Sequence, residues 1–399
     1  MSNIRQLFYK HLGQTSDFPM ALEIESATGM YQKDVNGKEY MDLIAGIGVS
    51  ALGHSHPSIL DAIDIQSKKY LHVMVYGEFI ESPQVQLAHK LAETLPESLD
   101  NVFLVNSGSE ATEGAIKLAK RYSGRSKIIS CFNAYHGSTS GALSICGNED
   151  LKISFRPLLP HIEFIRFGNL EDLTLIDDET AAIFIETIQG EAGVRKANKA
   201  YFQALRKRCN DMGVLLVLDE IQCGMGRTGS LWAFEEYDVS PDILLTAKGL
   251  GGGMPIGAFI SSKEIMGTLT TDPILGHITT FGGNPVSAAA AIATINEINN
   301  DHLLNAVPEK EACFKELLRH EHIIEVRGKG LMLAVEFESF QILQKIIHHL
   351  LEMGVITDWF LFCDNSLRIA PPLIITMDEI KMACNKILQA IDIVYSDAD

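Results

Sequence analysis

The sequence lacks any apolar run long enough to cross a lipid bilayer, and it does not open on a basic flank followed by a long apolar core. We therefore expect a cytoplasmic protein with neither a membrane span nor a secretory signal. Cationic residues are also scarce: 33 lysines and arginines face 51 aspartates and glutamates, a formal net charge of −18. Nucleic acid and anionic membranes are disfavoured as partners, because their phosphates need a basic face. Any anionic substrate must be held by a few local arginines.

Paired cysteines are missing as well. The seven cysteines are scattered and none stands in a Cys-x-x-Cys pair, which is typical of reduced thiols in a cytoplasm and offers no zinc site. His54 and His56 come closest to a metal-binding pair, but no third ligand accompanies them. We interpret both as structural hydrogen-bonding groups and predict no metal site.

The 399 residues are enough for about two to three domains, and they contain no internal repeat. Short buried strands alternate with helices up to about residue 299, which predicts an α/β domain with a mostly parallel sheet flanked by helices. Beyond residue 300 the pattern changes to that of a smaller α+β domain. We expect the large domain over 61–299 and the small domain from 1–60 together with 300–399.

A few local signals predict individual elements. Asn36-Gly37 is a turn signal and predicts a hairpin, whereas the glycine-rich segment 46–53 is expected to be a loop. Pro57 and Pro285 suit the first turns of the helices that follow them. A strand is expected through Leu367.

Two short apolar runs end on charged side chains in the middle of the chain. Residues 214–218 precede Asp219, and residues 243–247 precede Lys248, which glycines follow. Such runs indicate buried strands of a parallel sheet, whose ligands lie beyond the carboxyl ends of the strands. The two residues are 29 positions apart (248 − 219), which leaves room for two neighbouring strands and a crossing loop.

This pair of residues suits pyridoxal phosphate, which needs a lysine for its Schiff base, an aspartate against its pyridine nitrogen and a phosphate cradle. An enclosed lysine loses hydration, which lowers its pKa and frees a nucleophile. A buried carboxylate keeps the ring nitrogen protonated. Taken singly, Asp219 is as well explained by a helix cap and Lys248 by a surface position. Together, at strand ends inside glycine-rich turns, they favour the cofactor.

Three further strands are expected to end at the same edge of the sheet. Residues 102–106 run into a helix through Gly108 and Ser109, where free N–H groups and the helix dipole suit a phosphate. After the strand over 127–132, Tyr135 either stacks on a flat ring or closes the core. A strand over 181–186 places more carboxylates at this edge.

With these pieces in place, the chain resembles the class III pyridoxal-phosphate aminotransferases, in the group with acetylornithine, ornithine and 4-aminobutyrate aminotransferases. The resemblance runs from about residue 29 to 372 and implies a fold-type I transferase. It rests on six segments in the family's order: 52–57 (LGHSHP), 106–111 (NSGSEA), 186–193 (ETIQGEAG), 219–229 (DEIQCGMGRTG), 241–255 around Lys248, and 280–285 (TFGGNP).

The resemblance implies that Lys248 binds the cofactor covalently and that Asp219 pairs with its pyridine nitrogen. It also implies that Gln222 hydrogen-bonds the ring hydroxyl and that Tyr135 stacks on the ring face. The other implied cofactor contacts are Gly108, Ser109, His136, Glu186 and Thr280. Thr280 matches a threonine that reaches the phosphate of the neighbouring subunit, so we expect a homodimer with shared active sites.

On the substrate side, Arg368 matches the arginine that grips a substrate carboxylate, and Glu191 the glutamate that pairs with it in one half-reaction. Such a pair lets one pocket take a neutral amine chain or a dicarboxylate. Ser138 departs from the family, which usually has an arginine there for the donor's far carboxylate. Arg156 is a candidate to replace it in space. Ile47 stands where ornithine aminotransferase has a tyrosine, which disfavours ornithine.

The expected function is therefore amino transfer, in two stages, from an amino acid or ω-amine donor to a 2-oxo acid such as 2-oxoglutarate. The donor stays open among N-acetylornithine, diamines, ω-amines and β-amino acids. An aminomutase or racemase of the same fold is the alternative, and the Glu191 and Arg368 pair favours transfer. A nucleotide-binding protein is disfavoured, because 224–229 lacks the Walker lysine and 249–253 lacks an acidic ribose partner. A non-catalytic interaction protein leaves the lysine and aspartate unexplained.

Overall fold

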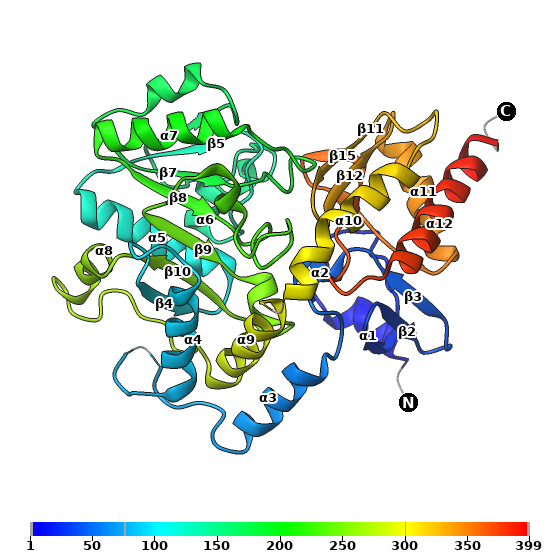
Figure 1. The fold of residues 1–399 in the computed structure, drawn as a ribbon, viewed down its shortest axis with the longest axis horizontal. Coiled ribbons are helices and arrows are strands. Elements are labelled where there is room, and N and C mark those ends of the chain that lie inside the picture. Colours follow the sequence, from blue (N-terminus) through cyan, green and yellow to red (C-terminus); the bar gives the residue numbers. More distant parts are fainter. Residues whose placement is uncertain (1–2, 76, 300, 397–399) are drawn as a thin grey trace.

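The computed structural model describes residues 3–75, 77–299 and 301–396, which form two lobes (Figure 1). The larger lobe is built on a seven-stranded sheet with the order β4-β10-β9-β8-β7-β5-β6. The smaller lobe holds two four-stranded sheets, β1-β2-β3-β13 and β11-β12-β15-β14. The first and last helices of the described chain, α1 (Ile4–His11) and α12 (Met377–Ser396), both lie in the smaller lobe.

The large sheet is mostly parallel, as expected. Its strands are β4 (Asn101–Val105), β5 (Lys127–Cys131), β6 (Ile162–Ile165), β7 (Thr180–Glu186), β8 (Leu215–Asp219), β9 (Ile243–Thr246) and β10 (Gly257–Ser261). Only β10 runs antiparallel to its neighbours, β4 and β9. Leu216 and Leu218 join one apolar core, whereas Leu215 and Val217 join another on the opposite face. Because both faces are covered, these strands are continuously apolar.

Helices pack on both faces of this sheet, and two of them begin at prolines. The remaining helices are α2 (Ala45–Gly48), α3 (Pro57–Ser67), α4 (Ser82–Glu93), α5 (Gly108–Ser123), α6 (Ser140–Ser144), α7 (Lys199–Met212), α8 (Lys263–Gly267), α9 (Pro285–Ile298), α10 (Asp301–Leu317) and α11 (Phe340–Glu352). Pro57 and Pro285 open α3 and α9, since proline suits a first helical turn. No helix among the described residues is both long and apolar enough to cross a membrane.

The smaller lobe combines strands from both ends of the chain. Its strands are β1 (Ile24–Thr28), β2 (Tyr31–Asp34), β3 (Glu39–Asp42), β11 (Glu325–Lys329), β12 (Met332–Glu336), β13 (Val355–Ile356), β14 (Trp359–Phe360) and β15 (Cys363–Ile369). The predicted hairpin around Asn36 and Gly37 is present, with β2 antiparallel to β3. Strand β13 then adds to β3 in parallel, more than three hundred residues later in the chain.

The glycine-rich segment after β3, predicted as a loop, forms a single left-handed turn at α2. Four successive residues have positive φ: Ala45 47°, Gly46 62°, Ile47 63° and Gly48 77°. A left-handed conformation costs a non-glycine residue about 1–2 kcal/mol, so the turn needs support. The buried Asp42 carboxylate supplies it by accepting the N–H groups of residues 44 and 45, both at 2.8 Å. The His54 ring lies 2.8 Å from the same carboxylate, in a structural role.

Candidate active site

A cavity of about 390 Å³ opens beyond the carboxyl ends of β4, β5, β7, β8 and β9. Its volume is in the range of small-molecule and cofactor sites. The residues that line it from the strand ends are Asn106, Ser107, Gly108, Ser109, Tyr135, His136, Gly137, Glu186, Asp219 and Lys248. Because parallel strands end at one edge of the sheet, residues more than a hundred positions apart share this space.

Asp219 is fixed at the end of β8. The parallel register sets it beside Glu186 on β7 and beside Leu245 on β9. The residue is 4% exposed, and its Oδ1 accepts the N–H of Ile221 at 2.9 Å. Its Oδ2 lies 2.7 Å from Nδ1 of the buried His136. The carboxylate is therefore held in one orientation at the floor of the cavity.

The His136 imidazole is paired with the Asp219 carboxylate, and this pairing changes its pKa. Burial alone would lower its pKa, but the hydrogen bond and the charge of Asp219 outweigh burial and raise it. The other ring nitrogen, Nε2, is buried and has no partner among the described residues.

Lys248 enters the cavity just after β9, in a short 3-10 turn over Lys248–Gly251. Its φ of +44° is a strained value for a residue with a Cβ atom. Burial lowers the pKa of its amine, although the Glu191 and Asp219 carboxylates act in the opposite direction. The Lys248 amine therefore loses its proton more readily than an exposed lysine does.

The amino terminus of α5 forms one wall of the cavity. The Ser107 hydroxyl accepts the N–H of Glu110 at 3.2 Å, and the Ser107 carbonyl accepts that of Ala111 at 3.1 Å. The N–H groups of Gly108 and Ser109 belong to the first turn, where helices leave such donors without an intrahelical acceptor. A Cβ atom on Gly108 would lie 2.9 Å from Ile221 Cδ1, so glycine lets the turn pack closely behind Asp219.

These groups fit pyridoxal phosphate by their chemistry. A lysine amine with a lowered pKa, a buried carboxylate and the amino terminus of a 16-residue helix line one cavity. They offer a covalent anchor, an anion for a ring nitrogen and donors for a phosphate. The described residues contain no cluster of three or more histidine, cysteine, aspartate or glutamate side chains that could hold a metal ion.

Glu186 hydrogen-bonds the segments that follow β5 and β7. One carboxylate oxygen accepts the N–H of Tyr135 at 3.0 Å, and the other accepts that of Gly190 at 2.8 Å. Burial raises the pKa of this carboxyl group to about 7. Glu186 therefore helps to shape the cavity by fixing two backbone segments that line it or lie beside it.

Gln222 and Glu191 meet at the far side of the cavity. The Gln222 amide donates to Glu191 Oε1 at 3.2 Å. Gly190 allows this contact, because a Cβ atom there would stand only 1.7 Å from Gln222 Oε1. Both side chains line the large cavity, and Gln222 also lines a smaller one with Ile47 and Arg368.

Arg368 and Glu191 form a buried, bidentate ion pair. Nη1 lies 2.9 Å from Oε1, and Nη2 lies 2.9 Å from Oε2. Burial would raise the pKa of Glu191, but the charge and hydrogen bonds of Arg368 outweigh it and lower the pKa to about 2. The glutamate is thus anionic at neutral pH and occupies the end of the guanidinium nearest the cavity.

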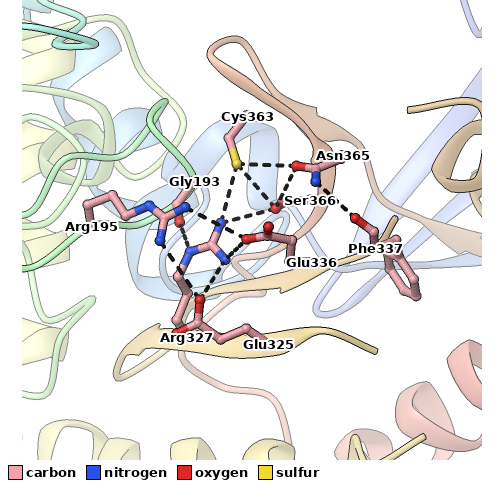
Figure 2. A network of polar contacts seen from close by, with 9 residues as sticks. All are labelled: Gly193, Arg195, Glu325, Arg327, Glu336, Phe337, Cys363, Asn365 and Ser366. Atoms are coloured by element: carbon pink, nitrogen blue, oxygen red, sulfur yellow. Dashed lines mark hydrogen bonds and ion pairs between the residues drawn. The ribbon is translucent and has the colours of Figure 1, made fainter. Parts of the chain in front are cut away.

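A polar network anchors the loop that carries Glu191 to the smaller lobe (Figure 2). Arg327 on β11 is 8% exposed and donates from Nε to the Gly193 carbonyl at 2.6 Å. It also pairs with Glu325 at 3.1 Å and with Glu336 on β12. Arg195, half exposed, lies 3.8 and 3.7 Å from the same two carboxylates. The network connects the two lobes immediately behind the ion pair.

Ser138, Arg156 and Thr280 lie outside the cavity lining. The exposed Ser138 has its hydroxyl 2.9 Å from the Tyr135 hydroxyl, and its N–H donates to Ser109 Oγ at 3.2 Å. Arg156 is exposed and pairs with Glu149, so within one chain it does not take the place of an arginine at 138. Thr280 is exposed and stands apart from the cavity of its own chain.

Sequence reasoning missed Asp358, whose Oδ1 accepts from Arg368 Nε at 2.8 Å. The two residues face each other in a hairpin formed by β14 and β15, where the Arg368 N–H also donates to the Asp358 carbonyl at 2.9 Å. A strand through Leu367 was predicted, but its short partner was not. Recognition of residues 361–362 as a tight turn would have placed the aspartate opposite the arginine.

The chain is similar to known proteins over most of its length. The model of the family "Aminotransferase class-III" matches residues 13–391. An acetylornithine aminotransferase of Caldanaerobacter subterraneus subsp. tengcongensis is 40% identical over 91% of this chain and 92% of its own.

Two solved structures extend the comparison. A transaminase from a marine Virgibacillus superposes with a TM-score of 0.94 at 28% identity, over 99% of this chain and 100% of its own. An ornithine aminotransferase of Toxoplasma gondii, whose active site holds PLP at partial occupancy, superposes with a TM-score of 0.92 at 30% identity. That superposition covers 99% of this chain and 94% of the other.

Proposed function

The chain belongs to the class III aminotransferases, and on this premise we propose which of its residues carry out the reaction and what they act on. It is a pyridoxal-phosphate-dependent transaminase. One observation carries the assignment of residues: Lys248 and Asp219 follow adjacent strands into one cavity, with the Arg368 and Glu191 pair at its far side.

When bound, pyridoxal phosphate supplies a ring that stabilises negative charge on a substrate carbon. Lys248 anchors it covalently and, once released, takes a proton from the amine-bearing carbon of the donor and passes it on. The lowered pKa of Lys248 supports this role, because a base must be able to lose its proton near working pH. Asp219, oriented by His136, keeps the ring nitrogen protonated.

The other assigned residues hold the cofactor in place. The Gly108 and Ser109 N–H groups would hold the phosphate, Tyr135 would pack against the ring, and Gln222 would bind the ring hydroxyl. Support comes from their position, since all four line the same cavity as Lys248.

Arg368 binds a carboxylate of the 2-oxo acid acceptor, for which we assign 2-oxoglutarate. In the donor half-reaction Glu191 occupies the guanidinium, as in the structure, and the pocket accepts an uncharged chain. In the acceptor half-reaction Glu191 moves aside and the substrate carboxylate takes its bidentate place. One site thereby serves two chemically different substrates in turn.

The amino donor is an ω-amine whose binding does not depend on an arginine at position 138. Lys248 is the only lysine or arginine that lines the cavity among the described residues, whereas Glu186, Glu191 and Asp219 line it as acids. A donor with a neutral or cationic far end, such as a diamine, suits this lining better than one with a far carboxylate.

The enzyme acts as a homodimer in the cytoplasm, with Thr280 of each subunit reaching the phosphate of the other. The exposed position of Thr280 supports the exchange. Exposed apolar side chains on the same loop, Ile274, Ile278 and Phe281, support a contact surface there. We assign residues 61–299 to the large domain, and 1–60 with 300–399 to the small one. The pairing of β13 with β3 supports that division.

The test separates the two half-reactions. Holoenzyme mixed with a diamine alone should release one equivalent of carbonyl product per site and lose its visible absorbance, and 2-oxoglutarate should then restore the absorbance and yield glutamate. Lys248→Ala should show neither the band nor the product. Return of the amino group to the donor's own skeleton would instead support an aminomutase, which the relatives do not favour.

A further inference from the structure

The Arg368 guanidinium is held on two separate edges. Its Nη1 and Nη2 atoms meet Glu191, which lines the large cavity. Its Nε atom meets Asp358 at 2.8 Å on the other edge, and Asp358 does not line that cavity. An incoming carboxylate therefore competes with Glu191 and leaves the Asp358 contact in place.

Strand β14 and the residues before it surround the guanidinium further. Nη2 donates to the Trp359 carbonyl at 3.1 Å, and the Phe360 ring centroid lies 4.4 Å from the central guanidinium carbon. The Thr357 hydroxyl donates to the Arg368 carbonyl at 2.7 Å. The arginine is thus fixed in plane by a carboxylate and a carbonyl and on one face by an aromatic ring.

We propose that Asp358 is a positioning residue for the acceptor: it holds the Nε edge of Arg368, so that the Nη edge stays turned to the cavity when Glu191 leaves. The inference rests on the proposed role of Arg368 in binding the acceptor carboxylate. Without this anchor the long arginine side chain follows Glu191 or adopts several rotamers, and the bidentate geometry is lost between half-reactions.

The pKa shifts of the two carboxylates beside Arg368 are consistent with an Asp358 that stays and a Glu191 that exchanges. Burial raises the pKa of Asp358, and the Arg368 cation opposes that rise. Arg368 lowers the pKa of Glu191 to about 2 although burial acts against it. With both carboxylates ionised, two anions share one cation, which makes the exchange of Glu191 for a substrate carboxylate easier than its removal from a lone partner.

The test compares two substitutions of Asp358 that differ in one respect. Asp358→Asn keeps an oxygen that accepts from Nε, whereas Asp358→Leu keeps the volume and removes the acceptor. Asp358→Leu should raise the KM for 2-oxoglutarate about 10-fold or more, as expected for loss of a charge-assisted contact. The single-turnover rate with a carboxylate-free amine donor should stay within about twofold of wild type. Asp358→Asn should return the KM to within about threefold.

Controls keep the outcome interpretable. Asp364→Leu, an exposed aspartate on the same strand β15, should leave both values unchanged. If Asp358→Leu does not fold, Asp358→Ser, whose short side chain is too distant from Nε, serves in its place. A normal rate in the donor half-reaction shows that the fold and the bound cofactor are intact.

Arg368→Lys separates the failure of this inference from failure of the proposed function. It should also raise the KM for 2-oxoglutarate. If it does and Asp358→Leu does not, Asp358 has no positioning role and the inference is overturned. If neither variant changes that KM, Arg368 does not bind the acceptor, and the role proposed for it is wrong as well.

Discussion

Ser138 lies next to the cavity, because its hydroxyl is 2.9 Å from that of Tyr135, which lines it. Ser138 itself is small and neutral, and among the described residues Arg156, the candidate to replace an arginine here, is paired with Glu149. The preference of the enzyme for one amino donor over another can therefore be tested by changing the side chain at position 138 alone.

Ser138→Arg should raise kcat/KM for donors that carry a far carboxylate, with N-acetylornithine as the probe, by about 10-fold or more. The reason is that a bidentate guanidinium contact is worth about 1.5–3 kcal/mol. The same change should lower kcat/KM for diamines, because two cations repel. Steady-state kinetics on both donors measures the effect, with Ser140→Arg, an exposed neighbour, as the control. A fall in kcat/KM for both donors would contradict the donor assignment.

The site residues at strand ends could be predicted from the sequence, whereas Asp358 could not. Asp219 and Lys248 follow continuous apolar runs, and the rule that ligands lie beyond the carboxyl ends of parallel strands places such residues without any coordinates. Asp358 is brought opposite Arg368 because the next two residues form β14, a short strand that pairs with β15. So short a segment carries no periodicity, and a lone aspartate beside a tryptophan gives no local signal.

At the scale of elements, the loop after β7 depends on the sheet of the smaller lobe. Arg327 on β11 binds the Gly193 carbonyl and two glutamates, and it is the buried arginine of the network in Figure 2. Removing it leaves a carbonyl and the largely enclosed Glu336 without their main partner. Arg195 contacts the same glutamates from a half-exposed position and at longer distances.

Arg327→Ala should destabilise the protein by about 2 kcal/mol, below the 3–5 kcal/mol typical of a broken buried pair, because Glu325 stays in contact with water. Arg195→Ala should cost about 0–1 kcal/mol, as surface ion pairs do. Thermal unfolding of the two variants side by side checks this, with a lower midpoint expected for Arg327→Ala by about 2–4 °C. Equal midpoints would show that the network does not hold the lobes together.

Element predictions succeeded where the signal was local and failed where it was not. Pro57 and Pro285 start helices by their own geometry, and the Asn36-Gly37 turn fixes its hairpin. The left-handed turn at α2 was not predicted, because the buried Asp42 carboxylate stabilises it against the preference of Ile47. Only the folded environment supplies that carboxylate in the right place.

At the scale of the whole molecule, the two ends of the chain meet in one lobe while the middle builds the other (Figure 1). Strand β13 pairs with β3, and Lys38 donates to the carbonyls of Leu351 and Glu352 at 3.1 and 2.8 Å. The cavity lies in the large lobe, and Arg368 approaches it from the small one. A change in the angle between the lobes would therefore alter the distance between Lys248 and the acceptor site.

The proposed dimer is also a property of the whole molecule. Sedimentation equilibrium at micromolar concentration should give twice the 43.9 kDa mass of the chain. Thr280→Ala should weaken cofactor binding while the sedimenting mass stays unchanged, because in the proposed dimer the Thr280 hydroxyl contacts the other subunit's phosphate and adds no apolar contact area. A monomer that binds the cofactor as tightly as the wild type would overturn the shared site.

Attachment of the cofactor to Lys248 is the claim on which the rest depends, and borohydride reduction of the holoenzyme followed by peptide mass mapping tests it most directly. The account predicts one reduced pyridoxyl group per chain, on the peptide that contains Lys248, and none in the Lys248→Ala variant. A label on another lysine, such as the buried Lys152, or a label that survives the substitution would contradict it.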